Sequence, residues 1–123
     1  MTRPQQLLNW TESIVETTEQ WKNKKISVQI TLTERDFDRH GSSYTHFSMI
    51  FKSCFMRTSG GRLMFDGTDN ELVEVAVGDL IAVDFLENTE NNNAKNEISM
   101  TEKIGKNNFG HDIIRRVRLI LKP

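Results

Sequence analysis

The chain has 123 residues, 37% of them hydrophobic, and a formal net charge of −1 at pH 7. This length fits one domain of ordinary size, so residues 1–123 are treated as a single domain. The near-neutral charge argues against a strongly basic nucleic-acid-binding protein. No apolar run reaches the roughly 20 residues that cross a bilayer, and no signal peptide is recognisable. The one cysteine, Cys54, excludes an internal disulfide. We therefore expect a cytoplasmic or other reducing intracellular compartment and no membrane partner.

Charge is unevenly distributed along the chain. Residues 1–65 carry nine basic against six acidic side chains, and residues 95–123 carry seven against three. Between them, residues 66–94 carry eight acidic side chains and no lysine or arginine. Two interpretations stay open. Oppositely charged strands could pair in one sheet, or the protein could have acidic and basic sides that orient a partner.

The first segment predicts a helix over residues 3–20. Thr2 and Gln5 have the spacing of a capping box, and Pro4 stands in the first turn, where a missing N–H costs little. Apolar residues recur at helical spacing through this segment. We expect the helix to cover one open end of a β domain. The alternative is that it docks on another subunit through Trp10 and Trp21, a residue type enriched at interaction hot spots.

From residue 26 the hydrophobic period changes to two, which indicates strands as far as residue 121. A long strand over residues 44–56 is expected to bend, with Phe47, Met49, Phe51 and Phe55 on one face. Further strands are expected over 72–77 and 80–86. In the closing strand, near residues 113–122, Arg115 breaks the alternation of apolar and polar residues. Residues 87–96 contain five asparagines and predict a flexible loop.

Six or seven short strands and one helix favour a mainly β fold. The predicted architecture is a small antiparallel β-barrel over residues 26–121, closed or partly open, of the oligonucleotide-binding (OB) type. Closure would remove the exposed edges of the sheet. A long bent strand, the turn at Gly60-Gly61 and the sequence Val77-Gly78-Asp79 before an apolar strand support this architecture.

Residues 57–86 resemble the middle of a PilZ-type barrel. The resemblance is carried by Ser59-Gly60-Gly61, the hairpin after it and Val77-Gly78-Asp79-Leu80-Ile81-Ala82-Val83. It implies a regulatory barrel that senses a cyclic dinucleotide. The paired arginines by which that family binds its ligand are not visible in this chain. Arg35 and Arg39 have the right separation but lie in an acidic loop ahead of a second long strand, so the resemblance implies a barrel without an intact nucleotide motif.

No catalytic constellation is recognisable, so we expect neither an enzyme nor a cofactor. Asp36, Asp38, His40 and His46 form a group of potential metal ligands, but their spacing is not that of a metal site, and none is predicted. Cys54 stands within an apolar strand. This position favours a buried structural thiol over a nucleophile.

The binding hypotheses rest on aromatic and basic residues. Single-stranded nucleic acid is held by aromatic faces that stack on bases and by cations that track phosphates. The candidate residues for such a ligand or for another partner are Tyr44, His46, Lys52, Arg57, Arg62, Lys106, Phe109, Arg115, Arg116 and Arg118. The leading hypothesis is a non-catalytic binding module that mediates protein–protein interaction in a larger assembly, with a protein partner or a second copy of the chain. The alternatives are a single-stranded nucleic-acid-binding protein of OB type and the PilZ-like regulatory barrel.

Overall fold

The computed structural model describes residues 1–35, 40–57, 59–87 and 95–123, and it contains one helix followed by seven strands. The helix is α1 (Arg3–Glu19). The strands are β1 (Lys25–Arg35), β2 (His40–Arg57), β3 (Arg62–Gly67), β4 (Leu72–Ala76), β5 (Leu80–Glu87), β6 (Lys95–Lys106) and β7 (Asp112–Leu121). A short 3-10 turn, η1 (Val77–Asp79), joins β4 to β5. No helix within the described ranges is long and apolar enough to cross a membrane.

Helix α1 begins where the capping pattern predicts. The hydroxyl of Thr2 accepts a hydrogen bond from the backbone N–H of Gln5 at 3.3 Å, and Pro4 lies in the first turn. A cap of this kind satisfies one of the backbone N–H groups that a helix start leaves without a partner. The predicted helix is confirmed to within one residue.

Both tryptophans of the helical region contact the core of their own chain. Trp21, in the turn after α1, is 2% exposed, and Trp10 is half-buried against the same core. The face of α1 that carries Ile14 and Thr18 is fully buried. These positions fit a helix that covers the β domain, and they leave Trp21 no surface for docking on a partner.

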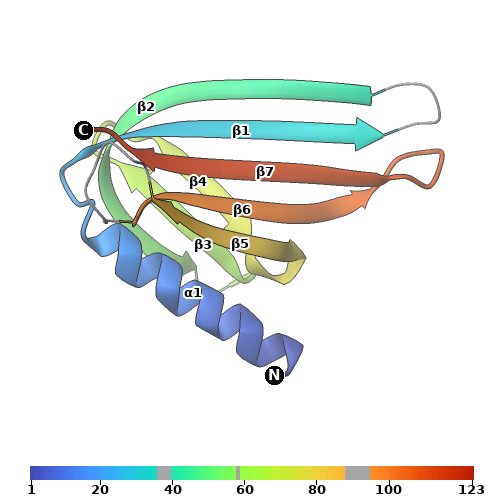
Figure 1. Ribbon diagram of the computed structural model, residues 1–123, viewed down its shortest axis with the longest axis horizontal. Coiled ribbons are helices and arrows are strands. Elements are labelled where there is room, and N and C mark those ends of the chain that lie inside the picture. The colour runs from blue at the N-terminus through green and yellow to red at the C-terminus, as the bar shows by residue number, and fades with distance from the viewer. Residues whose placement is uncertain (36–39, 58, 88–94) are drawn as a thin grey trace.

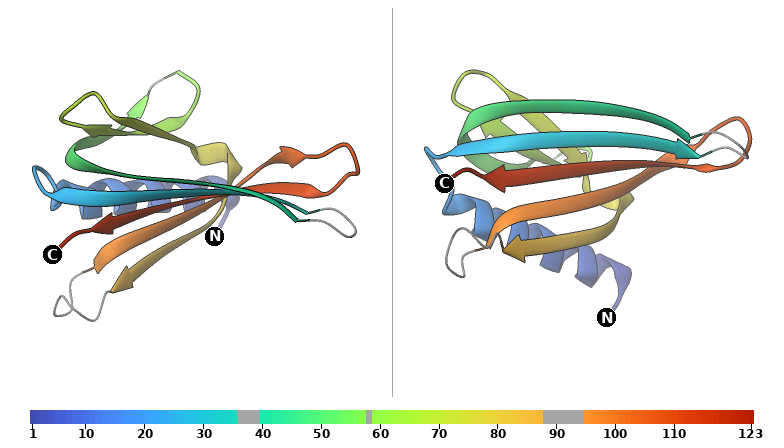
Figure 2. Two further views of the ribbon diagram at one scale, coloured as in Figure 1. Left: turned by 90° about the horizontal axis from the view of Figure 1, so that it is seen from above. Right: turned by 45° about the horizontal axis from the view of Figure 1, so that its top comes forward.

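The seven strands form one antiparallel sheet in the order β4-β3-β2-β1-β7-β6-β5. The sheet curves into a trough, and α1 lies along its open side (Figures 1 and 2). Its two edge strands, β4 and β5, are consecutive in the chain but do not pair with each other. The mainly β fold with an N-terminal helix is confirmed. Closure into an OB-type barrel is not, because the sheet stays open between β4 and β5.

A bulge in β2 produces the predicted bend. The register with β3 shifts between Phe51 and Ser53, so one extra residue enters β2. Phe51 points into the core and is 1% exposed, whereas Phe55 is 44% exposed. The prediction that Phe55 shares a face with Phe51 is therefore wrong, because the extra residue reverses the alternation of sides. Cys54 packs against the core instead.

A buried ion pair on the inner face of the sheet reaches the edge strand β4. Arg115 in β7 pairs with Glu102 in β6, whose side chain is 3% exposed. The guanidinium of Arg115 also donates to the backbone carbonyl of Glu74 at 3.0 Å. A carboxylate oxygen of Glu102 accepts from the backbone N–H of Ala76 at 3.2 Å. The two side chains thus give β4 the hydrogen bonds that a neighbouring strand would otherwise supply, which explains why Arg115 interrupts an apolar pattern.

We expect Arg115→Ala to lower the free energy of unfolding by about 3 kcal/mol, because it leaves the carboxylate of Glu102 buried without its partner. Urea denaturation followed by tryptophan fluorescence measures this loss. Arg62→Ala is the control, since it removes only an exposed pair with Glu74 at 3.7 Å and should cost less than about 1 kcal/mol. Equally small losses in the two variants would contradict the structural role of Arg115.

Candidate functional site

The outer face of the sheet, meaning the face turned away from α1, brings together candidate residues that are distant in the sequence. The strand register aligns two neighbouring rows across β2, β1, β7 and β6. These rows are Tyr44–Thr31–Arg116–Thr101 and His46–Gln29–Arg118–Ser99. Neighbouring strands lie about 4.8 Å apart, so the backbones of Tyr44 and Arg116 are about 10 Å apart. Four of the predicted binding residues therefore share one small area.

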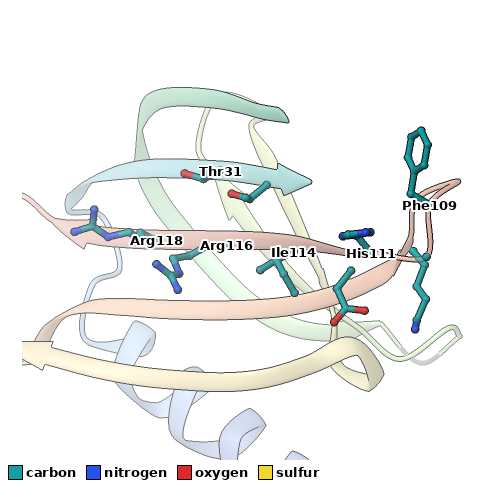
Figure 3. Close-up of a pocket in the computed structure, with 10 residues that line it drawn as sticks. Thr31, Phe109, His111, Ile114, Arg116 and Arg118 are labelled. Carbon is teal, nitrogen blue, oxygen red and sulfur yellow. The ribbon is translucent and has the colours of Figure 1, made fainter. Parts of the chain in front are cut away.

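A groove of about 800 Å³ continues this area toward the β6–β7 hairpin. This volume is within the range of small-molecule sites. The hairpin supplies an aromatic ring, an imidazole and a cation to the groove, and β1 and β7 supply its floor. In Figure 3 Phe109 stands at the end of the hairpin, while Arg116 and Arg118 lie along β7. The lining residues are Thr31, Thr33, Lys106, Phe109, Gly110, His111, Asp112, Ile114, Arg116 and Arg118.

The tip of the hairpin is held in one conformation by Asn107. Its side-chain oxygen accepts from the backbone N–H groups of Phe109 at 2.9 Å and His111 at 3.0 Å. Gly110 has a φ of 81°, a conformation that glycine adopts without strain. The ring of Phe109 is 65% exposed. A large aromatic side chain is thus presented to solvent from a well-bonded turn, so little backbone conformational entropy is lost when a ligand binds it.

The two outward arginines of β7 differ in how much hydrogen-bonding capacity they retain. Arg118 forms two hydrogen bonds with the carboxylate of Glu97, at 3.0 and 3.1 Å, and a third with the side chain of Gln29 at 2.9 Å. Arg116 is exposed and makes one long hydrogen bond, of 3.4 Å, to the hydroxyl of Thr101. Arg116 is therefore the better placed to bind an anionic group.

His46 and Tyr44 form a tilted pair of rings on β2, with ring centroids 6.3 Å apart. Tyr44 is 62% exposed. One ring nitrogen of His46 lies 2.7 Å from the hydroxyl of Ser27. Such a pair resembles a base beside a nucleophile, but Ser27 is fully buried and no substrate carbonyl could reach its oxygen. The contact orients the imidazole beside Tyr44.

The remaining predicted binding residues lie elsewhere. Arg57 and Arg62 face each other on the β2–β3 hairpin, where Arg62 pairs with Glu74. Lys52 is the extra residue of the β2 bulge, and Arg115 is on the inner face. Sequence reasoning missed the groove residues Thr31, Thr33, His111 and Ile114. Alternation in residues 26–33 marks the two threonines as outward, but nothing in the sequence shows that this strand pairs with β7.

Several predictions fall outside the described residues. They concern Asp36, Asp38 and Arg39, the side chain of His40, and most of the predicted loop at 87–96. Within the described ranges, no three histidine, cysteine, aspartate or glutamate side chains are grouped as metal ligands would be. Comparisons of the chain with protein-family models, with curated proteins and with solved structures found no match.

Cys54 lies on the part of β2 that follows the bulge, and its side chain packs against the core beside Thr18 of α1. Burial raises the pKa of its thiol to about 12, and the carboxylate of Asp66 adds to the rise, while a hydrogen bond with Thr18 opposes it. The thiolate is the reactive form of cysteine. At neutral pH this group therefore stays protonated and behaves as a small apolar side chain.

We expect iodoacetamide at about pH 8 to alkylate Cys54 at least about a hundredfold more slowly in the folded protein than in urea. Stability should respond to pH as well. Below the ordinary pKa of 9.0 the thiol of Cys54 is neutral in both the folded and the unfolded state. As pH rises from 9.0 toward 12, the thiol loses its proton in the unfolded chain but keeps it in the folded one. The free energy of unfolding therefore falls over this range. The stability difference between the wild type and Cys54→Ser should shrink over this range. Equal alkylation rates in the folded and unfolded protein would contradict the raised pKa.

Proposed function

We propose that this chain is a non-catalytic module that binds single-stranded nucleic acid on the outer face of β2, β1 and β7. The observation that carries the proposal is the gathering of exposed Tyr44, Phe109 and Arg116 on one solvated face of an antiparallel sheet. Short polar side chains such as Thr31 and Thr33 lie between them and leave room for flat bases. Stacking on an aromatic side chain is worth about 1–3 kcal/mol per base.

The distribution of charge on this face supports an anionic ligand. In the segment 66–74, Asp66 and Glu74 belong to β3 and β4, beyond the bend of β2, while Asp69 and Glu71, in the turn between these strands, lie beside Lys25 and not beside the groove. Among the described outward positions of β2, β1 and β7, the only acidic residue is Asp112, which pairs with Lys103 at 3.4 Å. Phosphate groups along the groove would therefore contact Arg116 and Lys106, whereas the guanidinium of Arg118 is already hydrogen-bonded to Glu97 and Gln29.

A protein partner is the second candidate. Ile114 and Phe109 give the groove an apolar portion, and aromatic and arginine residues are enriched at interaction hot spots. The ion pair between Arg118 and Glu97 also neutralises part of the positive charge beside the groove. Such a partner is distinguished by an affinity that changes little with salt, because phosphate contacts make nucleic-acid binding strongly salt-dependent.

Fluorescence anisotropy with labelled single-stranded DNA and RNA of about ten nucleotides tests the proposal. We expect salt-sensitive binding by the wild type. Phe109→Ala should weaken it by roughly 5- to 150-fold, which corresponds to the loss of one stacked base. Phe55→Ala is the matched control, since Phe55 is also exposed but lies beyond the β2 bulge. Absence of binding at low salt, or an equal effect of the control, would refute the proposal and favour the protein partner.

A further inference from the structure

Five exposed lysines gather at the end of the sheet opposite the β6–β7 hairpin, and we call this group the lysine end. Its members are Lys22, Lys24, Lys25, Lys52 and Lys122. Backbone hydrogen bonds bring their segments together. Asn23 N–H donates to the carbonyl of Phe51 at 2.8 Å, Phe51 N–H donates to that of Lys24 at 2.9 Å, and Lys122 N–H donates to that of Lys25 at 3.0 Å. Figure 1 shows the C-terminus beside the start of β1.

Two of these lysines stand on the same face as the groove. Ile26 and Val28 of β1 are fully buried, so Lys25 alternates outward with Gln29 and Thr31. Lys122 continues the alternation that turns Arg116 and Arg118 of β7 outward. Strand β7 has 10 residues, and at about 3.4 Å per residue it spans roughly 30 Å, so the lysine end lies about that far from the β6–β7 hairpin, which carries Phe109.

The folded protein does not neutralise the lysine end. Within the ranges that the structure describes, none of the five lysines forms an ion pair. The acidic side chains of Asp69 and Glu71 line a shallow depression with Lys25, and the carboxylate of Glu71 accepts from the backbone N–H of Asp69 at 2.8 Å. Lys22 and Lys24 suit the C-terminus of α1, where the helix dipole favours cations. That effect does not account for Lys25 on β1, Lys52 on β2 or Lys122, which directly follows β7. Like charges so close together repel one another.

We propose that the lysine end is a second anchoring point for the nucleic-acid strand that the groove binds; this inference rests on the proposed function. The groove would stack bases on Phe109, and the lysine end would hold phosphates through mobile point charges, as lysine does in other phosphate sites. A separation of about 30 Å suits an extended strand of several nucleotides, within the footprints known for single-strand-binding folds. A strand long enough to reach both points binds the second one at a high effective concentration. The site therefore has two parts and requires a minimum strand length.

A length series combined with charge reversal tests the inference. Labelled oligothymidylates of about 5 and about 15 nucleotides are titrated by anisotropy at several salt concentrations. The test variant is Lys25→Glu with Lys122→Glu. The control is Arg57→Glu with Arg62→Glu, which changes the net charge by the same amount on the β2–β3 hairpin. Circular dichroism and thermal melting confirm that both variants are folded.

For the wild type and the control, we expect the longer oligonucleotide to bind at least about tenfold more tightly than the shorter one. The lysine variant should lose most of this advantage and keep its affinity for the shorter oligonucleotide. Its salt slope for the longer one should fall by about 1.4, for two lost phosphate contacts on a single strand.

Three results would overturn the inference. The lysine variant could match the control on the longer oligonucleotide, or it could lose affinity for both lengths equally. It could also keep its affinity for DNA while losing binding to phosphatidylserine vesicles, which would assign the lysine end to anionic lipid. Failure of the wild type to bind either oligonucleotide at low salt would instead refute the proposed function itself, so the two failures are distinguishable.

Discussion

The pair of Glu102 and Arg115 holds together a sheet that does not close. Two edge strands that follow each other in the chain, β4 and β5, leave backbone groups at the mouth of the trough without a strand to bond them. Buried backbone groups need partners, and one carboxylate and one guanidinium supply two of them, at Ala76 and Glu74. An apolar pair of the same size would fill the space but offer neither a donor nor an acceptor. The position of β4 opposite β6 and β7, and with it the width of the trough that α1 covers, depends on this contact.

Because β2 bends, acidic and basic segments that are separate in the sequence are also placed on different parts of the folded sheet. Half of the eight acidic residues in the 66–94 segment belong to β3, β4 and the turn between them, which follow the bulge, while β1 and β7 carry outward cations. The sequence allowed two interpretations of the charge pattern, pairing between strands and separate acidic and basic sides, and the structure shows features of each. Oppositely charged residues do pair between strands, as in Arg118 with Glu97 and Arg62 with Glu74. The charged side chains at the described outward positions of β1 and β7 are nevertheless mostly basic, with Lys25, Arg116 and Arg118 against Asp112.

Local patterns predicted the elements, and they failed wherever the answer depended on contacts between distant segments. The cap at Thr2 and the alternation in β1 depend on neighbouring residues, so both were readable. The bulge beside Phe51 arises from the pairing with β3 and left no local signal, which is why Phe55 was placed on the wrong side. Arg115 did leave a signal, as the one charged residue at an apolar position, but its meaning required knowing that Glu102 and β4 lie beside it. The candidate site was predictable as a set of residue types and not as a place, because strand order decides which of them meet.

The outer face and the core share the same backbone, since Val28 and Val117 point inward next to Gln29 and Arg116, which point outward. A slip of one residue in the pairing of β1 with β7 would turn both strands over. Apolar side chains would reach water, and arginines would enter the core at a cost of several kcal/mol each. A chain with a misassembled outer face is thus also a chain that cannot stay folded. Correct strand register and a correctly displayed outer face are therefore coupled through stability, and a chain with the wrong register is exposed to the proteases that remove unfolded chains.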